Sequence, residues 1–300
     1  MLDRWFSTAG CGALAVLAAA AMALPAVGQA ATIVWAIDDA QSALTLNVPD
    51  QAVSLDGTNA TIRLRNANNS TWSQGRTAAV AGTLTTDFVD GVSIEFLTGQ
   101  HNAFGLTSGS FRPNPADFDP NATNAENPNG QFIGTSTAAA VFAAKVRASV
   151  SFVTLDVAYI SFLDVAYDIG SGAVPIAGTS FNSSGISVGV EQSIVALDGL
   201  STLVGQVIPD TDGTPFANIF GANSAAGGSV TSPDPINNPL LRRLEIPVNV
   251  PLTLTLEGTN LNASATGAIV AFALVPEPAT ALLLLGGLVG LAGAGRRRHA

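Results

Sequence analysis

Apolar and polar residues alternate with a period of two along most of residues 31–275. In the segment 61–65, for example, Ile62 and Leu64 share one face and two arginines share the other. Such alternation is typical of strands that bury one face against a core. The pattern therefore predicts an all-β fold, either a single antiparallel β-sandwich or a wide barrel.

Turn signals divide the alternating stretches into strands. Asp90 and Gly91 separate the runs 80–88 and 92–97, and an Asp-Gly pair between two alternating runs is a strong hairpin signal. Further strands are expected at residues 32–37, 42–48, 186–190, 193–197, 252–256 and 268–275, with a turn at 258–260. Stretches rich in proline and asparagine, at 107–131 and 209–239, are expected to form long polar loops.

Two segments depart from the simple pattern. The alanine-rich residues 137–148 have high helix propensity and are expected to form one short helix. The sequence Leu-Asp-Val-Ala-Tyr at 155–159 recurs at 163–167, and a spacing of eight places both copies on the same face of an extended chain. The carboxylates expected on the opposite face are Asp156, Asp164 and Asp168. This acidic face is either solvated or a row of carboxylates that faces a ligand.

The long uninterrupted apolar runs lie at the two ends of the chain. Residues 1–30 begin with a short charged stretch, continue through an apolar segment at 13–24 and end in small residues, which is the layout of a secretory signal peptide. As a helix, that segment measures about 18 Å, short of a hydrocarbon layer of about 30 Å. We therefore expect cleavage between Ala30 and Ala31 rather than a permanent anchor.

The last part of the chain, residues 276–300, is a tail with three components. A short motif is followed by an uncharged apolar segment at 279–294, about 24 Å as a helix, which predicts a transmembrane helix. The terminal basic cluster favours a cytoplasmic C-terminus. The motif is Pro276, Glu277 and Pro278, and the cluster is Arg296, Arg297 and Arg298. The chain thus divides into a signal peptide, a secreted β domain at 31–275 and this tail.

This tail resembles the PEP-CTERM sorting signal of Gram-negative bacteria. The resemblance implies that the Pro-Glu-Pro motif is recognised by an exosortase and that the arginines act as a stop signal. It also implies export, anchoring in the inner membrane before processing, and release to the cell surface or extracellular matrix. A partner implied by this route is the exopolysaccharide of a biofilm matrix.

Charge and sulfur content narrow the function further. The 300 residues carry a formal net charge of -10, and residues 31–275 hold 20 acidic and 8 basic side chains. Such a balance excludes a general attraction to nucleic acid. Both methionines and the single cysteine, Cys11, lie in the first 30 residues. After cleavage, the chain therefore has no disulfide, thiol nucleophile or cysteine metal site.

The secreted domain offers little material for catalysis. His101 is its only histidine and follows a predicted strand end, where we expect a solvated imidazole. No phosphate-binding loop accompanies it. We therefore predict no catalytic residues and no enzyme activity.

One polar loop has the alternating oxygen ligands of a calcium site. Its candidate ligands are Asp117, Asp119 and Asn121, with Glu126 downstream as a bidentate ligand. Ala122 stands where an EF-hand loop needs glycine. A second, weaker candidate is formed by Asp210 and Asp212. No other cofactor is expected.

The beginning of the domain is loosely similar to the Trp-x-x-Asp-x-x-His-Ser opening of YceI-like lipocalin barrels. The matching residues are Trp35, Asp38 and Ser42, and Gln41 stands where that family has histidine. The resemblance implies a barrel that binds an isoprenoid or a similar lipid.

Three functions follow from these observations. The first is a non-enzymatic structural or adhesive component associated with exopolysaccharide. The first alternative is a secreted β-barrel that binds a small molecule or lipid. The second alternative is a hydrolase that acts on glycans through a pair of carboxylates.

Overall fold

The protein is built from β-strands joined by turns and loops. The computed structural model describes residues 30–55, 58–65, 75–107, 110–111, 113–125, 127–199, 202–203, 206–207, 211–256 and 259–275. Two single 3-10 turns, η1 (Pro115–Asp117) and η2 (Ser183–Gly185), lie between strands. The predicted all-β class is confirmed.

Most of the strands belong to one large sheet. They are β1 (Ala31–Ile37), β2 (Ala43–Asn47), β3 (Gln51–Leu55), β4 (Thr58–Arg65), β5 (Arg76–Val89), β6 (Ser93–Phe96), β7 (Asn102–Gly105), β12 (Phe142–Val150), β13 (Val153–Gly170), β14 (Val174–Ala177), β15 (Ser180–Phe181), β16 (Ser187–Gly199), β19 (Thr211–Ala222), β20 (Gly228–Thr231), β21 (Leu241–Leu256) and β22 (Thr259–Leu274). Small two-stranded ribbons are formed by β8 (Ser110–Phe111) with β11 (Ala138–Ala139), β9 (Phe118–Asp119) with β10 (Gln131–Phe132), and β17 (Thr202–Leu203) with β18 (Gln206–Val207).

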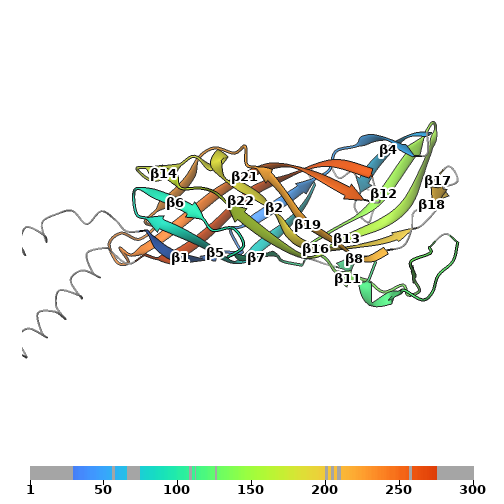
Figure 1. The fold of residues 1–300 in the computed structure, drawn as a ribbon, viewed down its shortest axis with the longest axis horizontal. Helices are drawn as coiled ribbons and strands as arrows, with labels where there is room; N and C mark the ends of the chain where they lie inside the picture. The colour runs from blue at the N-terminus through green and yellow to red at the C-terminus, as the bar shows by residue number, and fades with distance from the viewer. Residues whose placement is uncertain are drawn as a thin grey trace, which may run out of the picture. The chain divides into compact units, whose positions relative to one another are not determined.

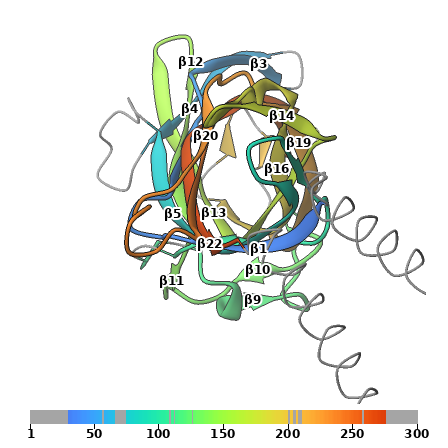
Figure 2. The ribbon, with the colours of Figure 1, turned by 90° about the vertical axis from the view of Figure 1, so that its left-hand side faces the viewer.

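The large sheet closes on itself. From β1, the hydrogen-bonded neighbours follow as β22, β21, β20, β15, β14, β6 and β5, and β5 pairs back with β1. These pairings are antiparallel. Figure 2 looks into the resulting ring. Of the two predicted architectures, the closed ring of pairings corresponds to the barrel.

Several positions around the barrel are filled by two short strands in line. β1 and β2 both pair with β5, and between them residues 37–42 lie opposite only 80–82. β6 and β7 share β5 in the same way, with residues 97–101 opposite 84–85. The extra residues of each interruption form a loop, and regular pairing with β5 resumes beyond it with the register shifted by three residues.

Buried polar side chains bind the interruptions to neighbouring strands. Between β1 and β2, Ser42 Oγ donates to Val270 O at 3.0 Å and accepts from Val270 N at 2.8 Å. Between β19 and β20, Asn223 Nδ2 donates to Pro247 O at 2.7 Å, and its Oδ1 accepts from Asn249 N at 2.8 Å. These contacts satisfy backbone groups that the broken ladder would leave unpaired.

At the end of the barrel far from the start of β1, the sheet continues from β13 through β12, β4 and β3. β12 pairs with β13 on one side and with β4 on the other, and β4 pairs with β3. Gln51 on β3 bridges to β22, because its Nε2 donates to Asn262 O at 2.9 Å and its Oε1 accepts from Asn262 N at 2.6 Å. Figure 1 shows β4 and β12 at one end of the barrel and β1 at the other.

The hydrophobic core fills the inside of the barrel. Trp35 is fully buried and packs edge-on against Phe88, with ring centroids 5.5 Å apart, while its Nε1 donates to Thr86 Oγ1 at 2.8 Å. Other buried core side chains are Leu44, Leu64, Leu84, Ile94, Phe96, Ile160, Ile169, Leu244 and Ile246. Each contributes about 1.5–3 kcal/mol by leaving water. The apolar positions of the period-two pattern thus form the inner face of the sheet.

The predicted helix at 137–148 is wrong. This segment contains β11 and most of β12, and β12 is paired along both edges. Ala140 and Ala143 instead pack closely against Leu163 and Ala196 in a small cluster. Pairing and close packing thus override the helix propensity of alanine, which is a weak preference of less than about 1 kcal/mol per residue.

The shared face predicted for the two Leu-Asp-Val-Ala-Tyr copies is also wrong. Tyr167 is buried in the core, whereas Tyr159 lies beside Lys145 on the outer face. The single bent strand β13 contains register shifts on either side of Ala166, and Asp164 has a φ of 47°. Because a bulge adds a residue to one strand, it reverses which residues face inward. Asp156 accepts a hydrogen bond from Lys145, Asp164 is exposed and Asp168 is buried, so the three carboxylates do not form one solvated row.

The expected loops are partly strands. The hairpin at Asp90 and Gly91 is confirmed, since β5 and β6 pair across it. Residues 209–239, expected as a loop, contain β19 and β20, and residues 258–260 overlap the start of β22. Pro215 lies within β19, where pairing with β16 continues on both sides of it. Residues 107–131 agree better, with only β8, η1, β9 and the first residue of β10 among those described.

The barrel unit does not include the two terminal segments of the chain. Residues Ala31–Val275 form one compact unit. Within the part of the chain that the structure describes, no helix is long and apolar enough to cross a membrane. The expected transmembrane helix at 279–294 lies outside the described residues.

Candidate functional site: a cationic face on β4 and β12

Half of the basic side chains of residues 31–275 lie on two neighbouring strands. Arg63 and Arg65 are on β4, and Lys145 and Arg147 are on β12. Alternate residues of both strands, such as Leu64 and Ala144, belong to the core, so the four cations project from the outer face of the barrel. We call this set the cationic face.

The strand register sets cations directly opposite one another. Arg65 is the cross-strand partner of Lys145, and Arg63 is the partner of Arg147. Like charges in this position repel and destabilise a sheet. Strand pairing alone would therefore disfavour this arrangement of charges.

Two carboxylates lie among the four cations. Asp50 Oδ2 lies 2.9 Å from Arg63 Nε, and its Oδ1 lies 3.1 Å from Arg65 Nη1. Asp156 Oδ2 lies 3.1 Å from Lys145 Nζ, and its Oδ1 lies 2.8 Å from Arg147 Nε. The Arg147 contact is an ion pair without hydrogen-bond geometry. These four positive and two negative charges sum to a surplus of two positive charges, and a further carboxylate, Asp198 on β16, follows Tyr159 in the same cross-strand row.

The pKa of Asp50 reflects this environment. Hydrogen bonds from Arg65 and then Arg63 outweigh desolvation and hold the pKa of the Asp50 carboxyl below its ordinary value. The unfolded chain therefore takes up this proton at a higher pH than the folded one. The stabilisation is complete above about pH 4 and is lost as the pH falls through the lowered pKa. Because Asp50 is 46% exposed, solvent screening keeps it to about 1 kcal/mol or less.

The four cations differ in accessibility. The side chains of Arg63 and Arg147 are 32% and 29% exposed, against 13% for Arg65 and 9% for Lys145. Lys145 Nζ lies 5.6 Å from the centre of the Tyr159 ring, within the range of a cation–π contact. Arg63 and Arg147 are thus the pair that a bound molecule would reach first.

Half of this face could be predicted from the sequence. The alternation at 61–65 placed Arg63 and Arg65 on the polar side of a strand, as the structure shows. Lys145 and Arg147 were missed as part of a face because their segment was assigned to a helix. The signal that could have revealed them is the period-two spacing of their charges around Val146.

The candidate calcium ligands lie at the β9–β10 ribbon. Asp117 Oδ2 accepts from Ser136 N at 2.9 Å, and Asp119 Oδ1 accepts from Asn121 N at 2.8 Å. Glu126 lies outside the described residues. Among the residues that are described, no three or more His, Cys, Asp or Glu side chains form a group suited to a metal ion. Calcium binding, to which Asn121 and Glu126 would contribute, stays a prediction.

The second candidate pair receives no further support. Asp210 lies outside the described residues. Asp212 belongs to β19.

The imidazole of His101 is buried, contrary to the solvated side chain expected. It is 1% exposed, its Nδ1 accepts from Thr85 N at 2.9 Å, and its Nε2 donates to Ile169 O at 2.6 Å. Asp168 Oδ1 lies 3.5 Å from Nε2, and both carboxylate oxygens accept from Gly99 N at 3.1 Å. These contacts bind the outward loop between β6 and β7 to β13, which gives the cluster a structural role.

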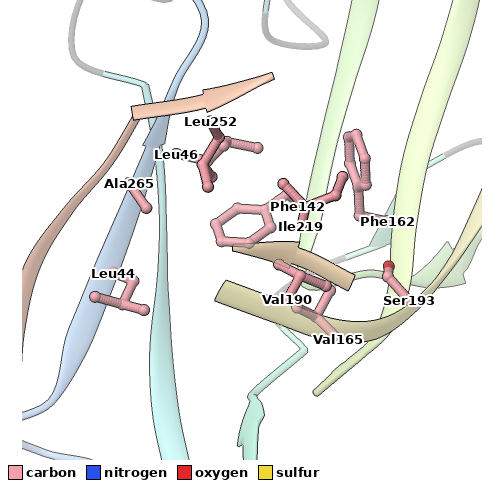
Figure 3. A pocket seen from close by; sticks show the side chains of 10 residues that line it. All are labelled: Leu44, Leu46, Phe142, Phe162, Val165, Val190, Ser193, Ile219, Leu252 and Ala265. Carbon is pink, nitrogen blue, oxygen red and sulfur yellow. The ribbon is translucent and has the colours of Figure 1, made fainter. Parts of the chain in front are cut away.

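The barrel interior contains a small apolar cavity. Figure 3 shows side chains from opposite walls, among them Leu44, Phe142, Val190 and Leu252, that point toward it. Its volume is about 40 Å³. By comparison, an apolar cavity of about 150 Å³ holds one benzene molecule. This space is therefore too small for the lipid that the YceI-like resemblance implies.

The two attachment points of the terminal segments lie at the same end of the barrel. Ala30 is exposed and β1 begins at Ala31, so the predicted cleavage point directly precedes the first strand. β22 pairs antiparallel with β1 and ends at Leu274, beside the start of β1. The predicted sorting residues, 276–278 and 296–298, lie outside the described residues.

Comparison with known protein families identifies the tail. A PEP-CTERM protein-sorting motif matches residues 274–298, and this motif implies export of the chain, a membrane-anchored sorting signal and processing by an exosortase. No curated protein and no solved structure matches the chain significantly. The YceI-like resemblance is thus not supported by these comparisons.

Proposed function

We propose that the protein is a non-enzymatic structural or adhesive component of the cell surface or extracellular matrix, associated with exopolysaccharide. The sorting motif at 274–298 carries this proposal, because it sends the chain through export and exosortase processing. The β barrel is then the part of the protein that remains to act outside the cell.

The position of the attachment points supports this proposal. The chain leaves the barrel toward the tail after β22, at Leu274. Gln51, next to the cationic face, bonds to Asn262, which lies farther back on β22 by about 40 Å of extended strand. Attachment through the tail would therefore leave the cationic face free to contact other molecules.

The cavity favours this proposal over the lipid-binding alternative. A carrier of a drug-sized or larger ligand needs a pocket of about 300 Å³ or more. The cavity of about 40 Å³ is lined by large core side chains such as Leu46 and Phe162. Binding a lipid there would require these side chains to separate, at the cost of their packing.

The sorting route is tested by changing its motif. We expect the double variant P276A/P278A to accumulate in the inner membrane as an unprocessed form, because the exosortase would no longer recognise it. Cell fractionation and immunoblotting measure the distribution. The matched control is P233A/P235A, which changes two exposed prolines of the barrel and should leave release normal. Normal release of P276A/P278A would refute the proposed route.

A further inference from the structure

The cationic face reverses the charge of the surface around it. Residues 31–275 have 20 acidic and 8 basic side chains, whereas this face has four basic and two acidic ones. Surface charges are screened over about 8–10 Å in physiological salt. A nearby ligand therefore senses the local surplus of positive charge more strongly than the net negative charge of the whole chain.

The fold does not require these cations. The next row of residues on the same outer face consists of hydroxyl side chains: Ser149 on β12 lies opposite Thr61 on β4 and opposite Thr154 on β13. Ser149 Oγ and Thr154 Oγ1 are hydrogen-bonded at 2.7 Å. In the row next to the cations, uncharged residues therefore occupy the outer face of the same paired strands without the repulsion between opposed cations.

From this geometry we infer that the cationic face is a binding site for a polysaccharide that bears carboxylates, with Arg63 and Arg147 as its main contacts. This inference rests on the proposed function and specifies its partner. The two arginines are opposite each other on strands about 4.8 Å apart, so one carboxylate can lie between their guanidinium groups.

The neighbouring groups define the class of ligand. Asp50 and Asp156 remain among the cations and repel a polyanion with closely spaced charges. A polysaccharide in which neutral ring faces and hydroxyls separate the carboxylates avoids that repulsion. The hydroxyls of Ser149 and Thr154, beside the arginines, can exchange hydrogen bonds with sugar hydroxyls.

The probe for this site is alginate, a polyuronate, with uncharged dextran as the control ligand. We expect the protein released from cells to bind immobilised alginate and not dextran, and to bind more weakly as sodium chloride rises from 50 to 300 mM. The variant R63Q/R147Q should lose about tenfold in affinity, because two charged contacts disappear. Equal binding to dextran, or stronger binding to DNA or anionic phospholipid vesicles than to alginate, would overturn the inference.

The matched control is R242Q/R243Q, which also removes two positive charges, in this case from β21. These arginines pair with Asp90 and Glu245, away from the cationic face, and their loss should change the affinity less than twofold. Thermal unfolding tests whether each variant is folded. If R63Q/R147Q is unfolded, the single variant R147Q takes its place. Equal weakening in both double variants would reject the site.

A parallel assay with the producing cell's own exopolysaccharide separates the two proposals. Loss of binding in R63Q/R147Q alone supports both. Equal binding by the wild type and R63Q/R147Q would retain the proposed function and reject the cationic face as the site. No binding by the wild type would reject the adhesive role itself.

Discussion

Asp168 shows how one carboxylate holds an interruption of the barrel in place. Its side chain is 3% exposed, and it accepts hydrogen bonds from the backbone N–H groups of Gly99 and Ile169. A buried carboxylate is costly unless such donors surround it. The outward loop at 97–101 supplies one of these donors, so the carboxylate and the loop stabilise each other.

We predict that D168N lowers the free energy of unfolding by about 2 kcal/mol. The asparagine has an NH2 group in place of one carboxylate oxygen, so a donor would face the N–H donor of Gly99. The matched control is D164N on the same strand. Asp164 is exposed with a φ of 47°, a conformation that asparagine tolerates, so its replacement should cost less than about 0.5 kcal/mol. Urea unfolding measures both. Similar losses in the two variants would contradict the role of Asp168.

Tyr167 presents the opposite situation at the scale of one residue. Its hydroxyl is buried and has no hydrogen-bond partner among the residues that the structure describes, and burial raises the pKa of this phenol. A Cβ added at Gly105 would lie 3.2 Å from the Tyr167 hydroxyl and 2.5 Å from Val141 Cγ1. The small residue on β7 thus leaves space for the tyrosine ring inside the barrel.

At the scale of elements, the interruptions and bulges determine which side chains face inward. On β13, Phe162 and Val165 both belong to the core although their positions differ in parity. The positive φ of Asp164 between them accounts for the change. An unbroken period of two would have placed these residues on opposite faces.

The β9–β10 ribbon is the element that carries the calcium prediction. Phe118 and Phe132 pack against each other across it, with ring centroids 5.1 Å apart. We expect calcium at ten times its dissociation constant to stabilise the released protein by about 1.4 kcal/mol and raise its melting temperature by about 4 °C. Calorimetry with and without calcium measures this, with magnesium as the control. An unchanged melting temperature in saturating calcium would contradict the prediction.

At the scale of the whole molecule, closure of the barrel depends on contacts between distant parts of the chain. β1 pairs with β22, so residues such as Ala36 and Phe272 become neighbours. Gly82 has a φ of 105°, and a Cβ there would lie 1.8 Å from Asn102 O. The backbones of β5 and β7 are therefore too close at this point for any residue other than glycine. Tight closure of this kind agrees with the small size of the apolar cavity inside.

We predict that the released protein carries no lipid. The cavity of about 40 Å³, with Leu44 and Leu252 on its walls, is several times smaller than the roughly 300 Å³ at which ligand pockets begin. Native mass spectrometry should therefore give the mass of the processed polypeptide alone. A retained adduct of several hundred daltons that dissociates on denaturation would contradict this prediction and favour a carrier.

Much of the fold could be predicted because strand alternation and turn residues act over short distances. The half-buried strand at 61–65 and the hairpin at Asp90 are examples, and the structure confirms both. The strand nature of 142–150 was not predictable from its alanines, because it depends on pairing with β4 and β13. The burial of His101 likewise depends on Asp168 and Ile169, which lie more than 60 residues away.

The amino-acid sequence by itself determined the all-β class and the sorting tail, because both are written in contiguous residues: a period of two in one case and a motif, an apolar run and an arginine cluster in the other. The tertiary structure alone decided that the sheet closes and that Lys145 and Arg147 meet Arg63 and Arg65. Strand pairing joins residues that are far apart in the chain, and a single bulge reverses a face. Local pattern therefore cannot specify which charges come together.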